Sequence, residues 1–467
     1  MSRGKQLFKN TIILSVGTFL PKLAQIIVLP IYTSMLTKSE YGTYDLINIL
    51  VSVLVPIITL QLQQAAFRFL IEMKDKKSIG SIVSNIYIFI IPISIICTSG
   101  LIIILNDITI IGRILIAMYL FIEIMTTTTR QVARGLSNNK GYSISSIVNS
   151  IFNVIFAILL LSIFNLGLSG LLLSLIISLS ISLIYLVINS HILSFIKISL
   201  FDKRILKNLL EYSLPMIPNS ISLWVVNLSD RLLIGKFMGV EANAIYAVSN
   251  KIPSVFGLAY NTFNMAWQES ASIASEDSDV SDYYSITFEG LFNFLVGAMA
   301  ILIACTPILF KVLIKGEYNE SYYQMPILFL GVFFSSLSSF YGGIYVAFKE
   351  SKKIGVSSTL SALLNFIINL LLIREIGIYA ASISTLISYF TLVVYRLKDI
   401  KRICNIRYKT RKNIICILIL ILMSVLCYQR NAIINKANIL IGVFFAVAIN
   451  KKIIVNVNKI ISLRFKK

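Results

Sequence analysis

The sequence is poor in charge and in paired cysteines, and each shortage excludes a familiar class of protein. Only 13% of its 467 residues are charged, about half the share in a typical soluble domain, whereas 57% are apolar. A chain of this composition is expected to be an integral membrane protein. Its five cysteines are scattered without the spacing of a metal site or a disulfide framework: Cys97, Cys305, Cys404, Cys416 and Cys427.

Signals of catalysis are also missing. The single histidine, His191, has no neighbours of metal-ligand type. No G-x-x-x-x-G-K-[ST] loop occurs, which excludes ATP binding of the P-loop kind. The connections between the apolar runs are too short to form a separate active-site domain. The sequence therefore predicts a protein that is not an enzyme and has neither a cofactor nor a metal site.

Basic residues are what the chain has in excess, with a formal net charge of +21. They lie in short segments between apolar runs, which is the pattern of the positive-inside rule and not of a nucleic-acid-binding face. Their distribution predicts a multi-pass protein of the cell membrane with both termini cytoplasmic. The N-terminus is basic and then apolar without a small-residue cleavage site, so we expect a retained first helix.

The apolar runs predict fourteen transmembrane helices, because about 20 helical residues cross the hydrocarbon core. The first twelve fall into two groups of six, and the last two form a separate pair. The expected spans are 10–36, 42–71, 79–105, 108–134, 141–164 and 167–196, then 212–237, 241–271, 284–314, 322–348, 354–373 and 377–398, and finally 412–430 and 437–457.

The two groups of six resemble each other. A shift of about 202 positions pairs polar residues of the second helix of each group: Tyr44 with Tyr246, Asn48 with Asn250, Ser52 with Ser254 and Thr59 with Asn261. Spacings of four and seven put them on one helical face, which we expect to avoid lipid. The stripe in the second group extends to Asn264. We predict an all-α fold of two six-helix lobes related by a parallel internal repeat, plus a C-terminal helix pair.

Later helices support the repeat, since Asn149 and Asn153 have the same spacing as Asn365 and Asn369. The predicted parts are an N-terminal lobe at 1–198, a cytoplasmic amphipathic linker at 199–211, a C-terminal lobe at 212–402, and a helix pair with a basic tail at 403–467. The linker's apolar residues are expected to lie on the membrane surface. An acidic connection at 275–284 is expected to be a solvated loop, with contact to a basic segment as the alternative.

Charged residues inside the predicted spans are candidates for a functional site, because burying charge in a bilayer is costly. Lys22, Arg231 and Lys251 lie in the first two helices of the lobes and, with Arg68 near a helix end, would line a cationic cavity. Such a cavity suits a phosphate-bearing ligand. Four acids are candidates for supporting the cations or coupling to an ion: Asp45, Glu123, Asp230 and Glu269. The alternative is that these charges are structural ion pairs or snorkelling residues.

The segments LPIYTSMLTKSEYGTYDLIN and SLPMIPNSISLWVVNLSDRLLIGKFMGVEANAIYAVSNKI, with helices in six-six-two order, resemble the oligosaccharide flippases of the multidrug/oligosaccharidyl-lipid/polysaccharide (MOP) exporter superfamily. The resemblance implies two lobes around a cationic cavity. It implies alternating-access flipping of a polyprenyl-diphosphate-linked oligosaccharide for surface polysaccharide biosynthesis. Lys22, Arg231 and Lys251 would then hold the diphosphate or an acidic sugar. Membrane lipids and other polysaccharide-assembly proteins are further expected partners, and nucleic acid is not.

Three alternatives remain open at this point. A cation-coupled multidrug exporter shares the architecture, but Lys22 in the first helix argues against cationic drugs. A membrane-embedded glycosyltransferase or polymerase is disfavoured by the short outer connections. A non-transporting scaffold for cell-envelope assembly is the third alternative.

Overall fold

The computed structural model describes residues 21, 23–71 and 73–464, and its regular elements there are helices. Eleven of these helices are long and apolar enough to cross a membrane. Two more predicted spans are the long helices α10 (Met216–Met238) and α11 (Val240–Ile273). Residues 10–20 and 22 of the first predicted span lie outside the described residues, and Leu23–Met35 of that span is an apolar helix. The all-α, multi-pass fold expected from the sequence is therefore confirmed.

The chain divides into two compact units. Unit 1 comprises Met1–Leu228 and unit 2 comprises Ser229–Lys467, so the division falls inside α10. Unit 2 thus contains the second group of six helices from Ser229 onward and also the C-terminal helix pair.

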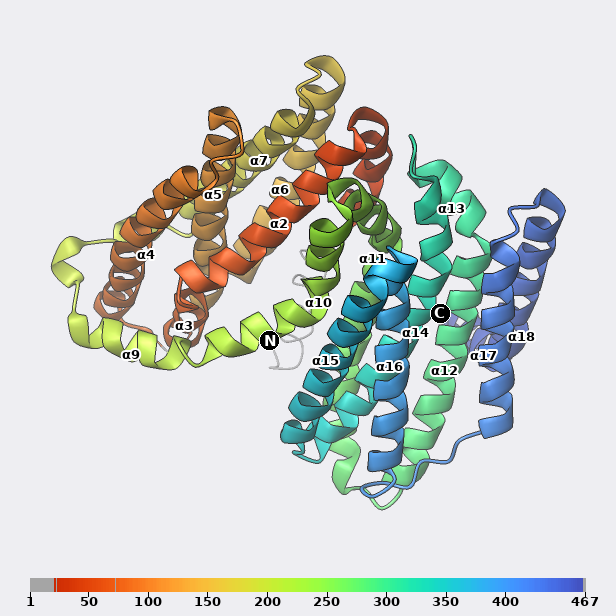
Figure 1. The fold of residues 1–467 in the computed structure, drawn as a ribbon. Coiled ribbons are helices and arrows are strands. Elements are labelled where there is room, and N and C mark those ends of the chain that lie inside the picture. Colours follow the sequence, from red (N-terminus) through yellow and green to blue (C-terminus); the bar gives the residue numbers. More distant parts are fainter. Residues whose placement is uncertain (1–20, 22, 72, 465–467) are drawn as a thin grey trace. The chain divides into compact units, whose positions relative to one another are not determined.

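Unit 1 is a bundle of long helices with short connecting turns (Figure 1). After a helical stretch at Leu23–Met35, its elements are α2 (Lys38–Ile58), α3 (Leu62–Leu70), α4 (Lys76–Ile104), α5 (Ile110–Gly135), α6 (Asn139–Ile158) with a π-helical turn (Leu159–Ile163), α7 (Gly167–Asn189), α8 (Ile192–Phe195), a 3-10 turn (Ile198–Leu200) and α9 (Lys203–Ser213).

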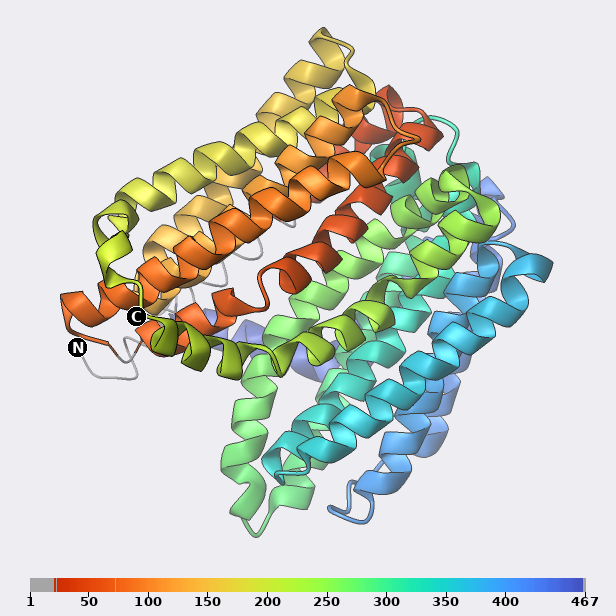
Figure 2. The same cartoon turned by 60° about the vertical axis from the view of Figure 1, so that its left-hand side comes forward.

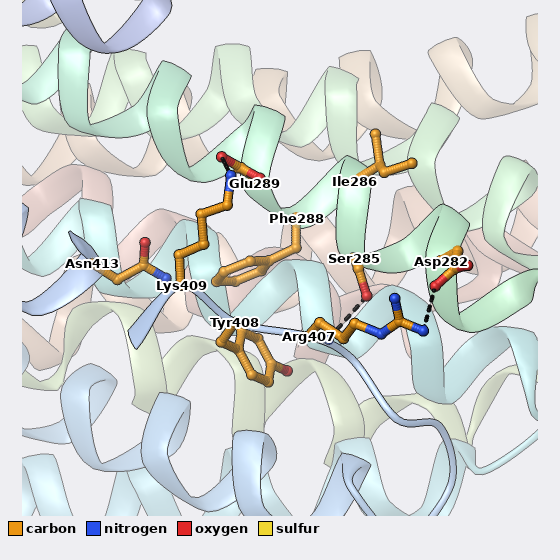
Figure 3. A pocket seen from close by; sticks show the side chains of 9 residues that line it. All are labelled: Asp282, Ser285, Ile286, Phe288, Glu289, Arg407, Tyr408, Lys409 and Asn413. Atoms are coloured by element: carbon orange, nitrogen blue, oxygen red, sulfur yellow. Dashed lines mark hydrogen bonds and ion pairs between the residues drawn. The ribbon is translucent and has the colours of Figure 1, made fainter. Parts of the chain in front are cut away.

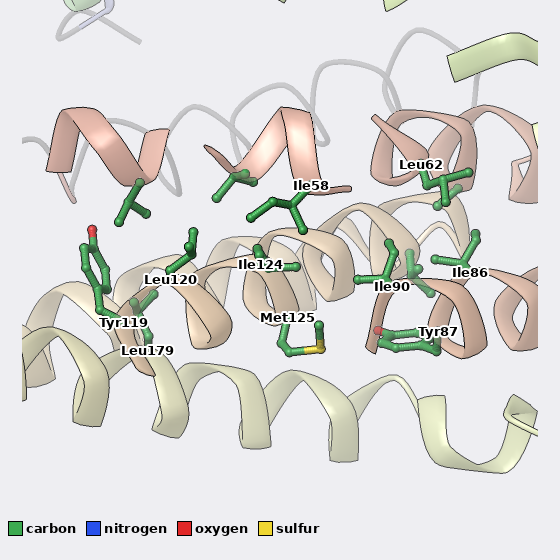
Figure 4. Packing of buried hydrophobic residues seen from close by; sticks show 14 of the residues in the cluster. Ile58, Leu62, Ile86, Tyr87, Ile90, Tyr119, Leu120, Ile124, Met125 and Leu179 are labelled. Atoms are coloured by element: carbon green, nitrogen blue, oxygen red, sulfur yellow. The ribbon is translucent and has the colours of Figure 1, made fainter. Parts of the chain in front are cut away.

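Capping side chains and a continuous apolar core explain where these helices start and how they pack. Asp75 begins α4 by accepting a hydrogen bond from the Ser78 backbone N–H at 3.0 Å, and this bond lowers the pKa of Asp75. Thr37 and Glu40 form a capping box at the start of α2. In the core, Leu120 and Ile124 on α5 lie between α2–α3 and α7 (Figure 4).

The apolar residues of the predicted amphipathic linker pack against protein, and its position at the membrane surface stays a prediction. Leu209 of α9 is fully buried, and Ile205, Leu206 and Leu210 pack into the core of unit 1. α9 lies against α3 and α4 (Figures 1 and 2). Its apolar stripe therefore anchors the linker to unit 1, while the charged side chains of Lys203, Arg204 and Lys207 remain exposed.

The predicted span 42–71 is interrupted at its middle. α2 ends at Ile58 with two crossed backbone bonds, from Gln61 N–H to Pro56 O at 3.3 Å and from Leu60 N–H to Ile57 O at 3.2 Å. This is a Schellman ending, and it puts Leu60 in the left-handed region at φ 49°. Gln61 follows at φ 59° and starts α3. Two adjacent non-glycine residues in this conformation store roughly 1–2 kcal/mol each.

Unit 2 continues from α10 with eight further helices and one 3-10 turn. They are α11, a 3-10 turn (Ala274–Glu276), α12 (Val280–Ala304), α13 (Thr306–Leu313), α14 (Asn319–Ala347), α15 (Ser351–Ile376), α16 (Tyr379–Ile400), α17 (Thr410–Cys427) and α18 (Ala432–Arg464).

α14 is the central helix of unit 2 and packs against α11, α12 and α16. The indole of Trp267 on α11 stacks on Phe340 of α14 with ring centroids 4.5 Å apart. The same indole N–H donates to the Phe340 carbonyl at 2.9 Å. One aromatic pair therefore fixes both the spacing and the register of α11 on α14.

The C-terminal pair, α17 and α18, lies along α12 (Figure 1). Glycines allow the close approach of α18. A Cβ on Gly297 of α12 would lie 2.5 Å from Asn450 Nδ2, and one on Gly442 of α18 would lie 3.0 Å from the Ala300 carbonyl. Asn450 Nδ2 also donates to the Asn293 carbonyl at 3.0 Å. Small residues at a helix crossing are typical of packing inside membranes.

The acidic connection at 275–284 contacts a basic segment through Asp282 and Arg407, as the alternative interpretation predicted. Arg407 lies 3.2 Å from the Asp282 carboxylate, and its backbone N–H donates to Ser285 Oγ at 2.9 Å (Figure 3). Lys409 lies 2.6 Å from Glu289. These side chains surround a pocket of about 370 Å³ between α12 and the connection that leads into α17.

Candidate functional site

A buried carboxylate in unit 2 joins four helices. Asp230 of α10 is 7% exposed. Its Oδ2 accepts from the Tyr246 hydroxyl of α11 at 3.1 Å and from Thr385 Oγ1 of α16 at 2.9 Å. Its Oδ1 accepts from Asn369 Nδ2 of α15 at 2.7 Å. Hydrogen bonds to a charged acceptor contribute roughly 1.5–3 kcal/mol each, which offsets part of the cost of burying Asp230.

The direction of these bonds leaves two amide oxygens uncommitted. Asp230 only accepts when ionised, so Asn369 must present its amino group and Thr385 its proton. The Thr385 oxygen in turn accepts from Asn365 Nδ2 at 3.1 Å. Oδ1 of Asn365 and Oδ1 of Asn369 are both buried without a hydrogen-bond partner. A buried acceptor without a partner costs roughly 1–3 kcal/mol.

This oxygen-rich cluster fits a hard cation. One carboxylate, two amide oxygens and hydroxyl groups are the ligand types that such ions prefer. The negative charge of Asp230 also interacts with the neighbouring Arg231. The described residues contain no group of three or more His, Cys, Asp and Glu side chains that could hold a metal ion, so the site lacks the charge typical of a divalent metal site.

Unit 1 has a related network on the corresponding helices. The Tyr32 hydroxyl donates to Asn153 Oδ1 of α6 at 3.3 Å, and Asn153 Nδ2 donates to Ser174 Oγ of α7 at 3.4 Å. The rings of Tyr32 and Tyr44 lie 6.0 Å apart, and the sequence repeat pairs Tyr44 with Tyr246. In unit 1 the group that bonds to the α6 asparagine is thus a phenol, whereas in unit 2 the group that bonds to the α15 asparagine is a carboxylate. Both units thus have a polar network on corresponding helices. The network described in unit 2 contains a carboxylate, and the one described in unit 1 is built from neutral side chains.

The predicted cations fall in different units. Lys22 lies outside the described residues. Arg68 is exposed near the end of α3 in unit 1. Arg231 on α10 and Lys251 on α11 are half-buried and both belong to unit 2. Of the four, the structure thus gathers Arg231 and Lys251 in one compact unit, and a cavity shared by both lobes stays a prediction.

The remaining acids differ in burial. Asp45 of α2 is 3% exposed. Glu123 of α5 is half-buried and accepts from Thr127 Oγ1 at 3.2 Å. Glu269 is exposed near the end of α11. Asp230 is the acid whose three hydrogen-bond donors come from three other helices.

The unit 1 half of the polar stripe bonds mainly within the bundle. Asn48 of α2 accepts from the Tyr119 hydroxyl of α5 at 2.8 Å and therefore links two helices. Ser52 and Thr59 donate to carbonyls of their own helix at 2.7 Å. The bond between Asn48 and Tyr119 is the kind that holds membrane helices together.

The unit 2 half is more open. Ser254 and Asn261 are exposed, and Asn250 is half-buried. Asn264 Oδ1 is buried without a hydrogen-bond partner. The stripe on α11 thus keeps more hydrogen-bonding capacity available than its counterpart on α2.

Sequence comparison decides the family. The family model described as "Polysaccharide biosynthesis protein" matches residues 7–268, which is more than half of the chain. The chain belongs to the polysaccharide biosynthesis protein family. The resemblance inferred from the sequence segments is thereby confirmed.

Solved structures show which fold this polysaccharide biosynthesis protein adopts. It is similar to the lipid II flippase MurJ in an inward closed conformation, with a TM-score of 0.69 and 14% identity over 96% of this chain and 99% of that chain. It is also similar to an inward-facing multidrug resistance MATE family transporter of the MOP superfamily, with a TM-score of 0.66 and 12% identity over 84% and 98% of the chains. At these identities the likeness shows a MOP-type fold.

A curated relative of this polysaccharide biosynthesis protein is an uncharacterized membrane protein of Methanocaldococcus jannaschii. The two are 22% identical over 231 residues, which make up 47% of this chain. The match covers 44% of the relative's own length.

Sequence reasoning named Asp230 but not the residues that complete its site. Asn365, Asn369 and Tyr246 were recognised only as repeat positions. Thr385 was not singled out, because a threonine among small residues of an apolar helix carries no signal of its own. The four-residue spacing of the two asparagines was the available signal, since it places both amides on one face of α15.

Proposed function

We propose that this polysaccharide biosynthesis protein is a flippase that moves a polyprenyl-diphosphate-linked oligosaccharide across the cytoplasmic membrane by alternating access. Family membership supports the polysaccharide pathway, and the MOP-type fold supports transport. The observation that carries the mechanism is the buried Asp230 site, with its uncommitted amide oxygens, in the middle of a membrane helix bundle.

The predicted cations serve as the anion-holding groups in this proposal. Lys22, Arg68, Arg231 and Lys251 would contact the diphosphate or an acidic sugar. An arginine forks to two phosphate oxygens, and a lysine acts as a compact charge. The amides on α11, among them Asn261 and Asn264, both donate and accept hydrogen bonds and so suit sugar hydroxyls.

The Asp230 site would supply the driving force as a monovalent-cation site. The ion would be held by Oδ1 of Asn365 and Asn369 and attracted by the negative charge of Asp230, whose own oxygens accept three hydrogen bonds from the protein. Its departure would leave Oδ1 of Asn365 and Asn369 without partners, so conformations that move α15 away from α10 and expose these oxygens to water would become less costly. Because the two conformations then differ in ion affinity, ion binding and conformational change are linked.

The test uses vesicles that contain the purified full chain and a polyprenyl-diphosphate-linked oligosaccharide. Transport is measured as the rate at which the sugar becomes accessible on the far side, with and without a sodium gradient. Asp230→Asn keeps the size of the side chain and removes the charge. We expect its transport rate to fall at least roughly tenfold, corresponding to about 1.4 kcal/mol, and to lose its dependence on sodium.

Asp399→Asn is the matched control. Asp399 also accepts from a tyrosine, Tyr345, at 2.9 Å and lies on the same helix as Thr385. It is roughly 21 Å farther along α16 at 1.5 Å per residue. Its variant should keep sodium dependence. If the transport rate of Asp230→Asn depends on sodium as in the wild type, the coupling site is refuted. If the wild-type protein exports a cationic dye and does not move the lipid-linked sugar, the result favours a multidrug exporter.

A further inference from the structure

A second buried charge in unit 2 is a cation near the end of the candidate membrane span α16. Arg396 is 3% exposed. Its Nη1 donates to the Ser338 carbonyl of α14 at 2.8 Å, and its Nη2 donates to Ser358 Oγ of α15 at 2.8 Å. Nε and Nη2 also donate to Ser357 Oγ of α15, at 3.1 and 3.0 Å. One guanidinium thus joins α16 to both α14 and α15.

The acceptors that hold Arg396 in the described part of the chain are neutral oxygens. Asp399, nearly one turn further along α16, pairs with Lys353 at 3.3 Å instead. Gly342 of α14 makes room for the guanidinium, since a Cβ there would lie 3.3 Å from Arg396 Nη1. Taking a charge out of water is costly even when hydrogen bonds satisfy it. What Arg396 contributes in return is a fixed contact among three helices.

A row of polar residues on α15 leads from Arg396 to the Asp230 site. Its members have a spacing of four, which keeps them on one face of the helix: Ser357, Ser361, Asn365 and Asn369. The first member binds Arg396 and the last binds Asp230. Between them, Ser361 Oγ donates to the Ser388 carbonyl of α16 at 3.0 Å. Asn365 Nδ2 donates to Thr385 Oγ1 of α16 at 3.1 Å. Hydrogen bonds therefore connect α15 to its neighbours over the whole distance from Arg396 to Asp230.

Unit 1 contains a similar contact in which the arginine comes from a different helix. Arg130 of α5 donates to Ser145 Oγ of α6 at 3.4 Å and to Ser182 Oγ of α7 at 3.2 Å. In the predicted repeat, α5, α6 and α7 are the counterparts of α14, α15 and α16. The arginine thus belongs to the first helix of the three in unit 1 and to the last in unit 2. In both units, one arginine and the serines of its neighbours hold together the helices that carry the asparagine network.

We propose that Arg396 is a positioning residue of the Asp230 cation site, because it fixes the register of α15 on α16. This inference rests on the proposed function. Arg396 is roughly 16 Å from Thr385 along α16 at 1.5 Å per residue, so it does not touch the ion. The acceptor oxygens of Asn365 and Asn369 both belong to α15. A shift of α15 along α16 would therefore move both oxygens relative to Asp230.

Charge and position predict opposite effects of removing Arg396. As a cation, Arg396 repels a positive ion, so its loss would strengthen sodium binding. As a positioning residue, it holds the site in its binding geometry, so its loss would weaken sodium binding. The direction of the change in affinity therefore distinguishes the two roles.

The test measures equilibrium binding of radioactive sodium to the purified full chain in detergent micelles. Arg396→Met removes the guanidinium and keeps a long, unbranched side chain. We expect its dissociation constant for sodium to rise roughly tenfold, which is the size of effect seen when a group behind the ligands of an ion is lost. The number of sites per folded chain should stay the same. A merely structural role of Arg396 would lower the number of sites and leave the dissociation constant unchanged.

Lys398→Met is the matched control, because Lys398 is an exposed cation of the same helix. It should not raise the dissociation constant. Arg396→Lys keeps the charge and can make part of the hydrogen bonds, so its dissociation constant should lie between those of the wild type and Arg396→Met.

A smaller change tests the same row if Arg396→Met does not fold. Ser361→Ala removes one hydrogen bond between α15 and α16 and should raise the dissociation constant roughly threefold. The inference is wrong if sodium binds Arg396→Met as tightly as the wild type or more tightly, or, where that variant does not fold, if it binds Ser361→Ala as tightly as the wild type. If the wild-type protein binds no sodium, the proposed coupling site itself fails, so the two failures are distinguishable.

Discussion

At the scale of single residues, the direction of each hydrogen bond around Asp230 is set by chemistry. A carboxylate accepts, so the amide of Asn369 must turn its oxygen away from Asp230. The same reasoning turns the oxygen of Asn365 away from Thr385. Two neutral residues thereby leave two buried acceptors without partners inside the unit, and these acceptors are the basis of the proposed cation site.

This arrangement predicts the effect of adding charge. Asn369→Asp places a second carboxylate beside Asp230 and removes the Nδ2 donor. In the absence of ions the two carboxylates repel each other in a poorly solvated site, so we expect a thermal midpoint lower by several degrees. Sodium or calcium should restore it, with a larger shift than in the wild type. Unfolding followed by tryptophan fluorescence at increasing salt concentration measures both effects.

Asn369→Gln serves as the comparison because it keeps the amide and changes only its reach. We expect the thermal midpoint of Asn369→Gln to be lower than that of the wild type. Sodium chloride and choline chloride should change this midpoint by the same amount. A midpoint of Asn369→Asp that is equally insensitive to the kind of cation would contradict the cation site.

At the scale of elements, the interruption between α2 and α3 is a feature that the local sequence does not predict. Pro56 marks the region, because proline lacks the N–H that would continue the helix. The left-handed conformation of Leu60 and Gln61, however, is not favoured by either side chain. Packing of α3 against α5 and α9 imposes it. No pattern in the span 42–71 could have placed the break, since its apolar residues read as one continuous helix.

Strain at Leu60 can be measured by comparing two glycine substitutions. Leu60→Gly removes a half-buried side chain but relieves the left-handed conformation. Leu54→Gly removes a similarly half-buried leucine from the helical part of α2 and adds the cost of glycine in a helix. We expect the loss in free energy of unfolding to be smaller in Leu60→Gly than in Leu54→Gly, with a difference of roughly 2 kcal/mol.

The readout is the free energy of unfolding in mixed detergent micelles, titrated with a denaturing detergent. Equal losses in the two variants would show that the break between α2 and α3 is relaxed. Leu60→Ala gives a further comparison, because it removes the side chain without relieving the backbone.

At the scale of the whole molecule, the sequence predicts an all-helical multi-pass protein but not every polar network. Hydropathy and the distribution of Lys and Arg depend on composition, and they carry over directly to a bundle of membrane helices. The site depends on residues more than 100 positions apart, such as Asp230 with Asn369 and Thr385, which meet only after packing. The contact of Asp282 with Arg407 is likewise invisible until α12 and α17 are adjacent.

The attachment of the C-terminal helix pair gives a prediction at this scale. Gly297→Val should push α18 away from α12, because its Cβ would overlap Asn450 and approach Ala446. Overpacking of this kind costs roughly 1–3 kcal/mol. Gly290→Val, two turns away on the same helix, points into open space and should be close to neutral in stability.

A cysteine pair engineered across α12 and α18 reports the separation directly, through the yield of its cross-link. Gly297→Val should reduce the yield and Gly290→Val should not. Removing Arg407 instead should change stability by less than about 1 kcal/mol, since exposed ion pairs contribute little. A cross-link yield unaffected by Gly297→Val would show that α18 tolerates a wider spacing.

The burial of α14 also constrains the order in which the protein is made. Within its most apolar window, 78% of α14 is buried, compared with 22% for α15. Gln324 of α14 accepts a hydrogen bond from Ser382 of α16, which is 58 residues later in the chain. At 5–20 residues per second the ribosome needs roughly 3–12 s to reach that partner. During this interval the buried Gln324 side chain lacks the Ser382 donor, so we expect the packing of α14 to be completed only when α16 joins it.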